Sequence, residues 1–180
     1  MVNMNANREQ DREHLMELPK EKLIDLLFTH IRDIWSEDGL YFIGIEKKCG
    51  TDMAIEIDRE VWAVMGKIEA RRLKDILDIN GTDIAALVET LKHSDWWLDL
   101  EKKEYEVDGN RAVFRNKECR VQLTRIKKGL GEFGCKNVRW GFLKNFVKEF
   151  NPNILVNCLV CPPDKHPEDV WCEWEFSIKE

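Results

Sequence analysis

The spacing of apolar residues changes near Asp95, and this change constrains the fold more than any other feature of the chain. Before it, apolar side chains recur every three or four residues, which is the period of an amphipathic helix. After it, apolar and polar residues alternate in places, and Asp108-Gly109 is a strong hairpin signal. The pattern predicts an α+β fold, in which an N-terminal helical layer packs on a C-terminal antiparallel sheet with one covering helix.

Three segments follow from this change in a chain of 180 residues. Residues 1–17 are polar, and we expect a flexible N-terminus there. Residues 18–94 form the helical layer, and residues 95–180 form the cysteine-rich α+β half. No Pro- or Ser-rich linker separates the two halves, so we expect one integrated domain.

Local signals set the expected helix boundaries in the first half. Pro19 stands near the first turn of a helix, and Asp38-Gly39 is expected to end or bend it. Gly66 is expected to interrupt a later helix, and residues 83–92 form the last helix of the layer.

In the second half, residues rich in aromatic and β-branched side chains predict strands over 96–106 and 111–124. An amphipathic helix is expected over 138–150. Two further strands are expected over 154–160 and 171–178.

Five of the six cysteines lie in the last third of the chain, namely Cys119, Cys135, Cys158, Cys161 and Cys172. Zinc prefers four soft or borderline ligands in a tetrahedron, and a C-x-x-C pair at a strand end supplies two. We therefore prefer Cys135, Cys158, Cys161 and Cys172 as zinc ligands, with Cys119, expected in a strand, as the alternate. Four protein ligands make a closed structural site, whereas three leave a position for water or a substrate.

Other roles for these thiols stay open. Cys119 and Cys172 are each as well explained as core residues. Cys158 and Cys161 are compatible with a redox dithiol. In thioredoxin-like proteins such a pair lies at a helix N-terminus, which lowers a thiol pKa, whereas here Pro162-Pro163 follows and a loop is expected. Four thiolates are also compatible with an iron–sulfur cluster, which ligand type alone does not separate from zinc. Cys49 is more typical of a core or cap neighbour.

Other chemistry-bearing residues are weaker candidates. His166 reads as a metal ligand, a general base or a surface histidine, and Asp164 reads as a turn residue or a catalytic carboxylate. Trp96, Trp97 and Trp174 are among seven tryptophans that favour core packing over a ligand pocket. No Walker loop, G-x-G-x-x-G or H-E-x-x-H is present, so the catalytic residues and the reaction stay unassigned.

Net charge and hydropathy restrict the expected partners and the expected cellular location of the protein. The net charge of −6 argues against a nucleic-acid partner, because binding a phosphate backbone needs cations. No stretch reaches the ~18 apolar residues of a membrane span, and the N-terminus has no apolar signal region. We therefore expect a cytoplasmic protein, and in a reducing cytosol clustered cysteines favour metal binding over disulfides.

The segment from Cys158 through Cys161-Pro-Pro-Asp164 and on to Asp169, with Trp171-Cys-Glu-Trp, resembles an uncharacterised family of archaeal and anaerobic bacterial cytosolic proteins. The last sixty residues are more distantly similar to vinyl-4-reductase-type domains. That resemblance implies an α+β fold with a small-molecule pocket, often a homodimer, and a Cys-bound metal in some members. A looser pattern of C-terminal cysteines is similar to aminothiazoline-carboxylate hydrolases.

These observations together predict a cytosolic, Cys-ligated zinc protein with a pocket for a small apolar or carboxylate ligand. The first alternative is a metal- or thiol-dependent hydrolase of a small C–N or C–S compound. The second is an iron–sulfur protein or a redox or metal sensor.

Overall fold

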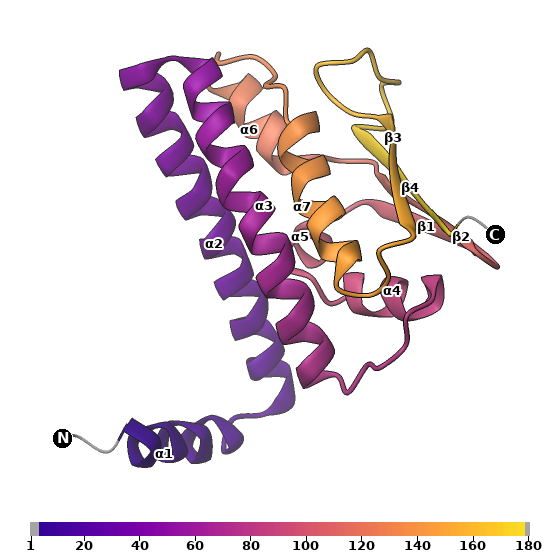
Figure 1. The fold of residues 1–180 in the computed structure, drawn as a ribbon. Coiled ribbons are helices and arrows are strands. Elements are labelled where there is room, and N and C mark those ends of the chain that lie inside the picture. The colour runs from indigo at the N-terminus through magenta and orange to yellow at the C-terminus, as the bar shows by residue number, and fades with distance from the viewer. Residues whose placement is uncertain (1–3, 179–180) are drawn as a thin grey trace.

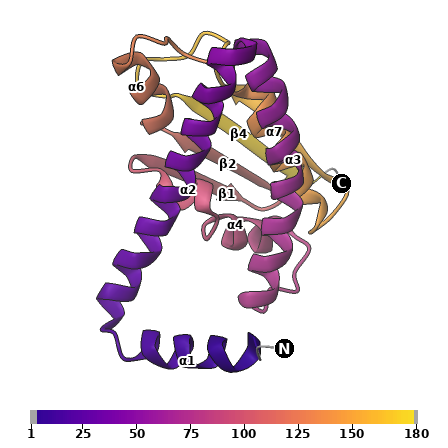
Figure 2. The same ribbon diagram turned by 90° about the vertical axis from the view of Figure 1, so that its left-hand side faces the viewer.

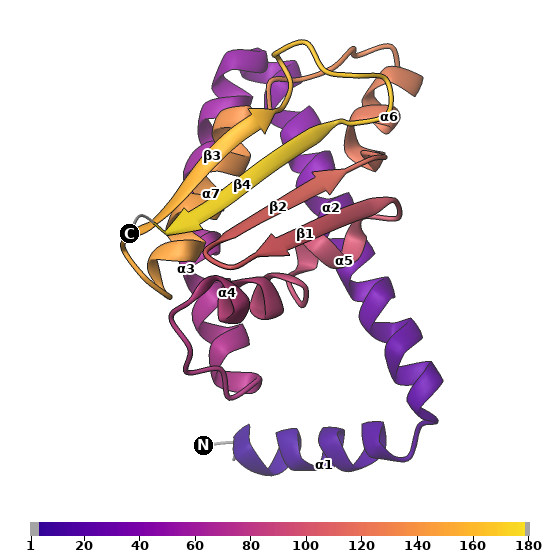
Figure 3. The ribbon, with the colours of Figure 1, turned by 90° about the vertical axis from the view of Figure 1, so that its right-hand side faces the viewer.

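The structure is a computed structural model, and it describes residues 4–178. Helices α2 (Lys20–Cys49) and α3 (Thr51–Ile76) form a long antiparallel hairpin along one side of the molecule (Figure 1). Gly50 joins them with φ +87°, a conformation that favours glycine. Helix α1 (Met4–Met16) lies off the far end of α2, away from the sheet (Figures 1 and 3). It falls within the segment expected to be flexible, whose residues 1–3 lie outside the described part.

Two short helices connect the hairpin to the sheet. Helix α4 (Ile84–Leu91) begins where the Asp83 carboxylate accepts a hydrogen bond from the Ala86 amide at 2.8 Å. Helix α5 (Asp95–Asp99) is capped in the same way by Ser94, whose hydroxyl accepts from the Trp97 amide. Both caps supply acceptors for backbone N–H groups that a helix start leaves free.

The second half of the chain supplies all four strands. Strands β1 (Lys103–Asp108), β2 (Arg111–Asn116), β3 (Ile154–Val160) and β4 (Cys172–Ile178) form one antiparallel sheet in the order β1-β2-β4-β3. Helices α6 (Arg120–Lys127) and α7 (Lys136–Lys148) lie between β2 and β3 in sequence. The predicted α+β class and the packing of helices on an antiparallel sheet are confirmed.

The helices lie against one face of this sheet, as Figure 2 shows from the hairpin side. Figure 3 shows the opposite face, which none of the described helices covers. The inner face of β4 buries Trp174 and Phe176 completely, in the same hydrophobic core as Phe142 and Phe146 of α7. Burial of each such side chain stabilises the fold by about 2–3 kcal/mol.

Two predicted breaks in the helical half are wrong. Helix α2 continues through Asp38-Gly39, where a Cβ on Gly39 would meet nothing within 4 Å. Helix α3 continues through Gly66, whose missing side chain makes room for α7. A Cβ at Gly66 would lie 2.3 Å from the Phe142 carbonyl oxygen, so this glycine marks a close helix crossing. At Gly66, packing of α3 against α7 outweighs the low helix propensity of glycine.

Two predicted strands are also wrong in part. Residues 95–99 are helix α5, and the first strand begins only at Lys103. The second strand ends at Asn116, and the remainder of the predicted segment is mainly helix α6. Cys119 is therefore the N-cap residue of α6 and does not lie in a strand. The predicted hairpin at Asp108-Gly109 and the predicted strands near 154–160 and 171–178 are confirmed.

Candidate functional site

Four of the five C-terminal cysteines come together from three segments of the fold. Cys135 is the N-cap residue of α7. Cys158 lies in β3 beside a bulge, Cys161 directly follows that strand, and Cys172 begins β4. All are free thiols. The hairpin formed by β3 and β4 thus meets the start of α7 at a sulfur-rich contact, which we call the thiol cluster.

Cys161 is the centre of the thiol cluster. Its side chain is completely buried, and its Sγ lies 3.6 Å from the Sγ of Cys135. Hydrogen bonding with Cys135 is the main reason that the pKa of Cys161 is raised, followed by interaction with Cys158 and Cys172 and by burial. The same hydrogen bonds lower the pKa of Cys135 and of Cys158. Protons are therefore shared unequally among thiols in contact.

Cys119 lies beside the thiol cluster but forms no thiol hydrogen bond with it. It lines a cavity of about 60 Å³ together with Cys135, Cys161 and Cys172. Burial raises the pKa of Cys119 to about 12, so this thiol stays protonated at neutral pH. Within residues 4–178, no group of three or more Cys, His, Asp or Glu side chains is arranged so that it could hold a metal ion.

The other sulfur and polar candidates lie elsewhere. Cys49 ends α2 and is exposed. The His166 ring packs on Trp171, with ring centroids 4.8 Å apart, and its Nε2 lies 3.5 Å from a carboxylate oxygen of Glu132. Asp164 forms an ion pair with Lys136 at 2.6 Å, which links the loop after β3 to the first turn of α7.

A second constellation, which the sequence reasoning missed, consists of four largely buried carboxyl groups on α2, α3 and α5. Asp38 accepts a hydrogen bond from Trp62 Nε1 at 3.0 Å and shares another with Asp58. Glu69 accepts a hydrogen bond from the Asp95 amide at 2.8 Å. Burial, with repulsion from Asp38, raises the pKa of Asp58 to about 7. Burial, with repulsion from Asp95, raises the pKa of Glu69 to about 8.

Arg139 of α7 is a cation that acts on all four of these carboxyl groups. Its guanidinium lies over the rings of Trp35, Trp62 and Trp96, at 5.3, 5.7 and 4.8 Å from their centroids. Its charge lowers the pKa of all four carboxyls, but burial outweighs that effect. One arginine does not neutralise four carboxylates, so the group holds protons at neutral pH.

A signal for this constellation is present in the sequence. Asp58, Trp62, Met65 and Glu69 follow one another at spacings of four, three and four, so they share one helix face. Acidic residues on a face that is otherwise apolar are unusual in a core and are typical of functional sites.

A cavity of about 240 Å³ lies between α2 and α6, beside the two aspartates of this constellation. Asp38 and Asp58 lie on its α2–α3 side. Trp35, Arg120 and Val121 line both this cavity and the smaller one beside the thiols. The buried ion pair of Arg125 with Glu46, at 2.9 Å, links α6 to α2 along the same cavity.

Comparison with known proteins gives one result. A family model described as "Family of unknown function (DUF6125)" matches residues 16–178. No curated protein and no solved structure shows significant similarity to the chain.

Proposed function

The chain belongs to this family of unknown function, and we propose from its own residues that it is a zinc-binding protein. The proposed ligands are Cys135, Cys158, Cys161 and Cys172. The observation that carries the proposal is the meeting of these thiols, from a helix start and both strands of a hairpin, around the buried Cys161. Thiolates are the preferred ligands of structural zinc.

The distance between sulfurs supports zinc. Zinc–sulfur bonds of about 2.3 Å in a tetrahedron place neighbouring sulfurs about 3.8 Å apart. The Cys135 and Cys161 sulfurs are 3.6 Å apart, which is close to that edge. An iron–sulfur cluster places several irons and sulfides among its thiolates and therefore needs a wider arrangement.

Zinc binding requires a rearrangement of the thiol cluster. The Cys135 and Cys161 sulfurs are already in contact, but the described thiols do not yet surround a common point at which an ion could bind. We expect the Cys161 side chain to rotate and the thiols to lose their protons as the ion enters, so that affinity rises with pH. The ion would then fasten the β3–β4 hairpin to the first turn of α7, next to the larger cavity.

Metal analysis of the purified protein tests this proposal. The protein is prepared without oxygen, and zinc, iron and acid-labile sulfide are measured for the wild type and for each Cys→Ser variant. We expect one zinc per chain in the wild type, and loss of that zinc in Cys135→Ser, Cys158→Ser, Cys161→Ser and Cys172→Ser.

Two matched variants act as controls. Cys49→Ser removes an exposed thiol far from the cluster, and it should keep the zinc. Cys119→Ser removes the neighbouring thiol and should also keep it. Wild-type protein that takes up no zinc from a zinc-supplemented medium would refute the proposal. Acid-labile sulfide would replace it with an iron–sulfur site, and zinc loss in only three variants would indicate an open coordination position.

A further inference from the structure

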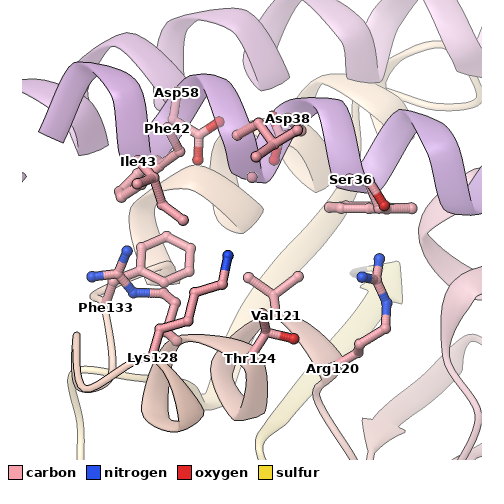
Figure 4. A pocket seen from close by; sticks show the side chains of 14 residues that line it. Ser36, Asp38, Phe42, Ile43, Asp58, Arg120, Val121, Thr124, Lys128 and Phe133 are labelled. Atoms are coloured by element: carbon pink, nitrogen blue, oxygen red, sulfur yellow. The ribbon is translucent and has the colours of Figure 1, made fainter. Parts of the chain in front are cut away.

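The cavity between α2 and α6 has walls of opposite charge. Figure 4 shows Lys128 and Arg120 pointing from the α6 side toward α2, while Asp58 points into the cavity from the opposite side. The cavity encloses about 240 Å³, below the range of ~300–1,000 Å³ typical of sites for drug-sized ligands. It therefore suits a compact molecule of the size of an amino acid.

The acidic wall is a carboxyl pair. Asp38 and Asp58 both line the cavity, and Trp62 donates a hydrogen bond to Asp38 at 3.0 Å. Burial raises the pKa of both carboxyls, and repulsion from Asp38 helps to raise that of Asp58 to about 7, so a nearby cation would favour their ionised forms. Such a pair attracts a cationic group and also accepts its N–H hydrogens.

On the basic wall, one of three cations is available. Arg125 is held by Glu46 at 2.9 Å. Arg120 is held by Asp99 at 3.2 Å. Lys128 is exposed and forms no ion pair with any residue that the structure describes. An anionic group in the cavity would therefore meet the Lys128 ammonium.

Apolar side chains fill the space between the two walls. The rings of Phe42 and Phe133 lie 4.9 Å apart at one end of the cavity, and Arg125 covers both rings. Ile43 and Val121 also contribute to this apolar lining. A ligand with an uncharged hydrocarbon part would bury it here, at a gain of about 25 cal/mol per Å².

We propose that this cavity binds a small zwitterion, with its cationic nitrogen at Asp38 and Asp58, its anionic group at Lys128, and an apolar body between them. The ligand class is that of a free amino acid with an apolar side chain. The proposal stands on the charges and shape of the cavity and does not depend on zinc in the thiol cluster.

Isothermal titration calorimetry with three forms of the same molecules tests the proposal. The probes are L-leucine, L-methionine and L-phenylalanine, each as the free amino acid, as the methyl ester, which keeps only the cation, and as the N-acetyl derivative, which keeps only the anion. We expect at least one free amino acid to bind saturably. We also expect both of its single-charge forms to bind about tenfold more weakly or worse, which is the loss from one charge-assisted hydrogen bond.

Substitutions in each wall of the cavity test which wall binds the cationic group of the ligand and which binds its anionic group. Lys128→Met should weaken the free amino acid about tenfold and leave the ester unchanged. Asp58→Asn should weaken the free amino acid and leave the N-acetyl form unchanged. Lys127→Met at the end of α6 and Asp33→Asn on α2 change exposed residues that do not line the cavity, and both variants should bind like the wild type.

The proposal is overturned if none of the nine compounds binds saturably, or if the esters or N-acetyl forms bind as tightly as the amino acids. Circular dichroism confirms that each variant folds. The same titrations on Cys161→Ser separate this inference from the zinc proposal, because the zwitterion site should persist when the thiol cluster is altered.

Discussion

Asp58 is an ionisable side chain held in a poor environment for its charge. It lies beside Asp38, and burial is the main reason that its pKa rises from 3.8 to about 7. In the unfolded chain the group ionises near pH 4, whereas in the folded protein it retains its proton until near pH 7. Between these values the folded state binds more protons, so this group's contribution to stability falls as pH rises.

The change Asp58→Asn should remove this pH dependence. Between pH 5 and pH 8, the free energy of unfolding of the variant should rise by about 1–2 kcal/mol relative to that of the wild type, because its amide cannot ionise. Asp38, Glu69 and Asp95 are unchanged in the variant. Urea unfolding at the two pH values measures the difference. Asp33→Asn, at an exposed position on α2, should show the same difference from wild type at both pH values. An equal result for Asp58→Asn would show that Asp58 ionises normally.

Among single residues, the sequence indicates which cysteines could lie close together, but it does not indicate the pairing of Asp38 with Asp58. Cys135, Cys158, Cys161 and Cys172 were identifiable because thiols are rare and their local elements were well signalled. Cys119 was misplaced because its segment has strand-like composition although it caps a helix. The environment of Asp38 is set by contacts with α3, such as the hydrogen bond from Trp62. A helix break at Asp38-Gly39, as predicted, gives no reason to expect those contacts, because they need α2 to continue alongside α3.

At the scale of the elements, α3 and α7 cross at close range. Gly66 allows the backbone of α7 to approach, and Asn145 Nδ2 of α7 donates to the Ala63 carbonyl at 2.7 Å. The crossing holds α7 in place, and with it Cys135 at its N-cap and Arg139 over the tryptophans. The geometry of both constellations therefore depends on this contact.

Gly66→Ala should destabilise the protein by about 2–3 kcal/mol, because the added methyl would have to displace the Phe142 backbone. Gly44→Ala on α2 is the matched control, since its Cβ meets nothing within 4 Å. There the better helix propensity of alanine should add about 0.5–1 kcal/mol. Thermal unfolding followed by circular dichroism compares the two. Equal stability of both variants would refute the close crossing.

Helix continuity was the main limit on predicting the elements. Glycine and Asp-Gly signals describe local preference, and tertiary packing reversed that preference in α2 and α3. Trp96 and Trp97 favour strands by composition, but the Ser94 cap and burial on the helical layer place them in α5. The hairpin at Asp108-Gly109 was predictable because its turn chemistry and its strand pattern agree.

For the whole molecule, the outer side of the α2–α3 hairpin is unusually apolar. Tyr41 is 68% exposed and Val61 is 51% exposed. Ile34 and Ile57 line a groove with them. None of the described helices is both long and apolar enough to cross a membrane. An antiparallel helix pair of this kind can pack on its own copy as a four-helix bundle.

We therefore expect the protein to form a homodimer through this face. Light scattering on a sizing column should give twice the mass of one chain. Val61→Lys should shift the equilibrium to single chains, because the dimer would bury an unpaired charge. Leu159→Lys, at an exposed position on β3, should leave the dimer intact. A wild type that stays monomeric at high concentration would contradict the prediction.

The ion pair of Arg125 and Glu46 has a consequence for how the cavity responds to ionic strength. Both side chains are largely shielded from water, so dissolved salt screens their attraction weakly, whereas it readily screens the exposed Lys128. At high ionic strength, the spacing between α2 and α6 should stay the same, whereas the electrostatic attraction between Lys128 and an anion should weaken. The proposed zwitterion would then bind more weakly at high salt than at low salt, although the shape of the cavity stays the same.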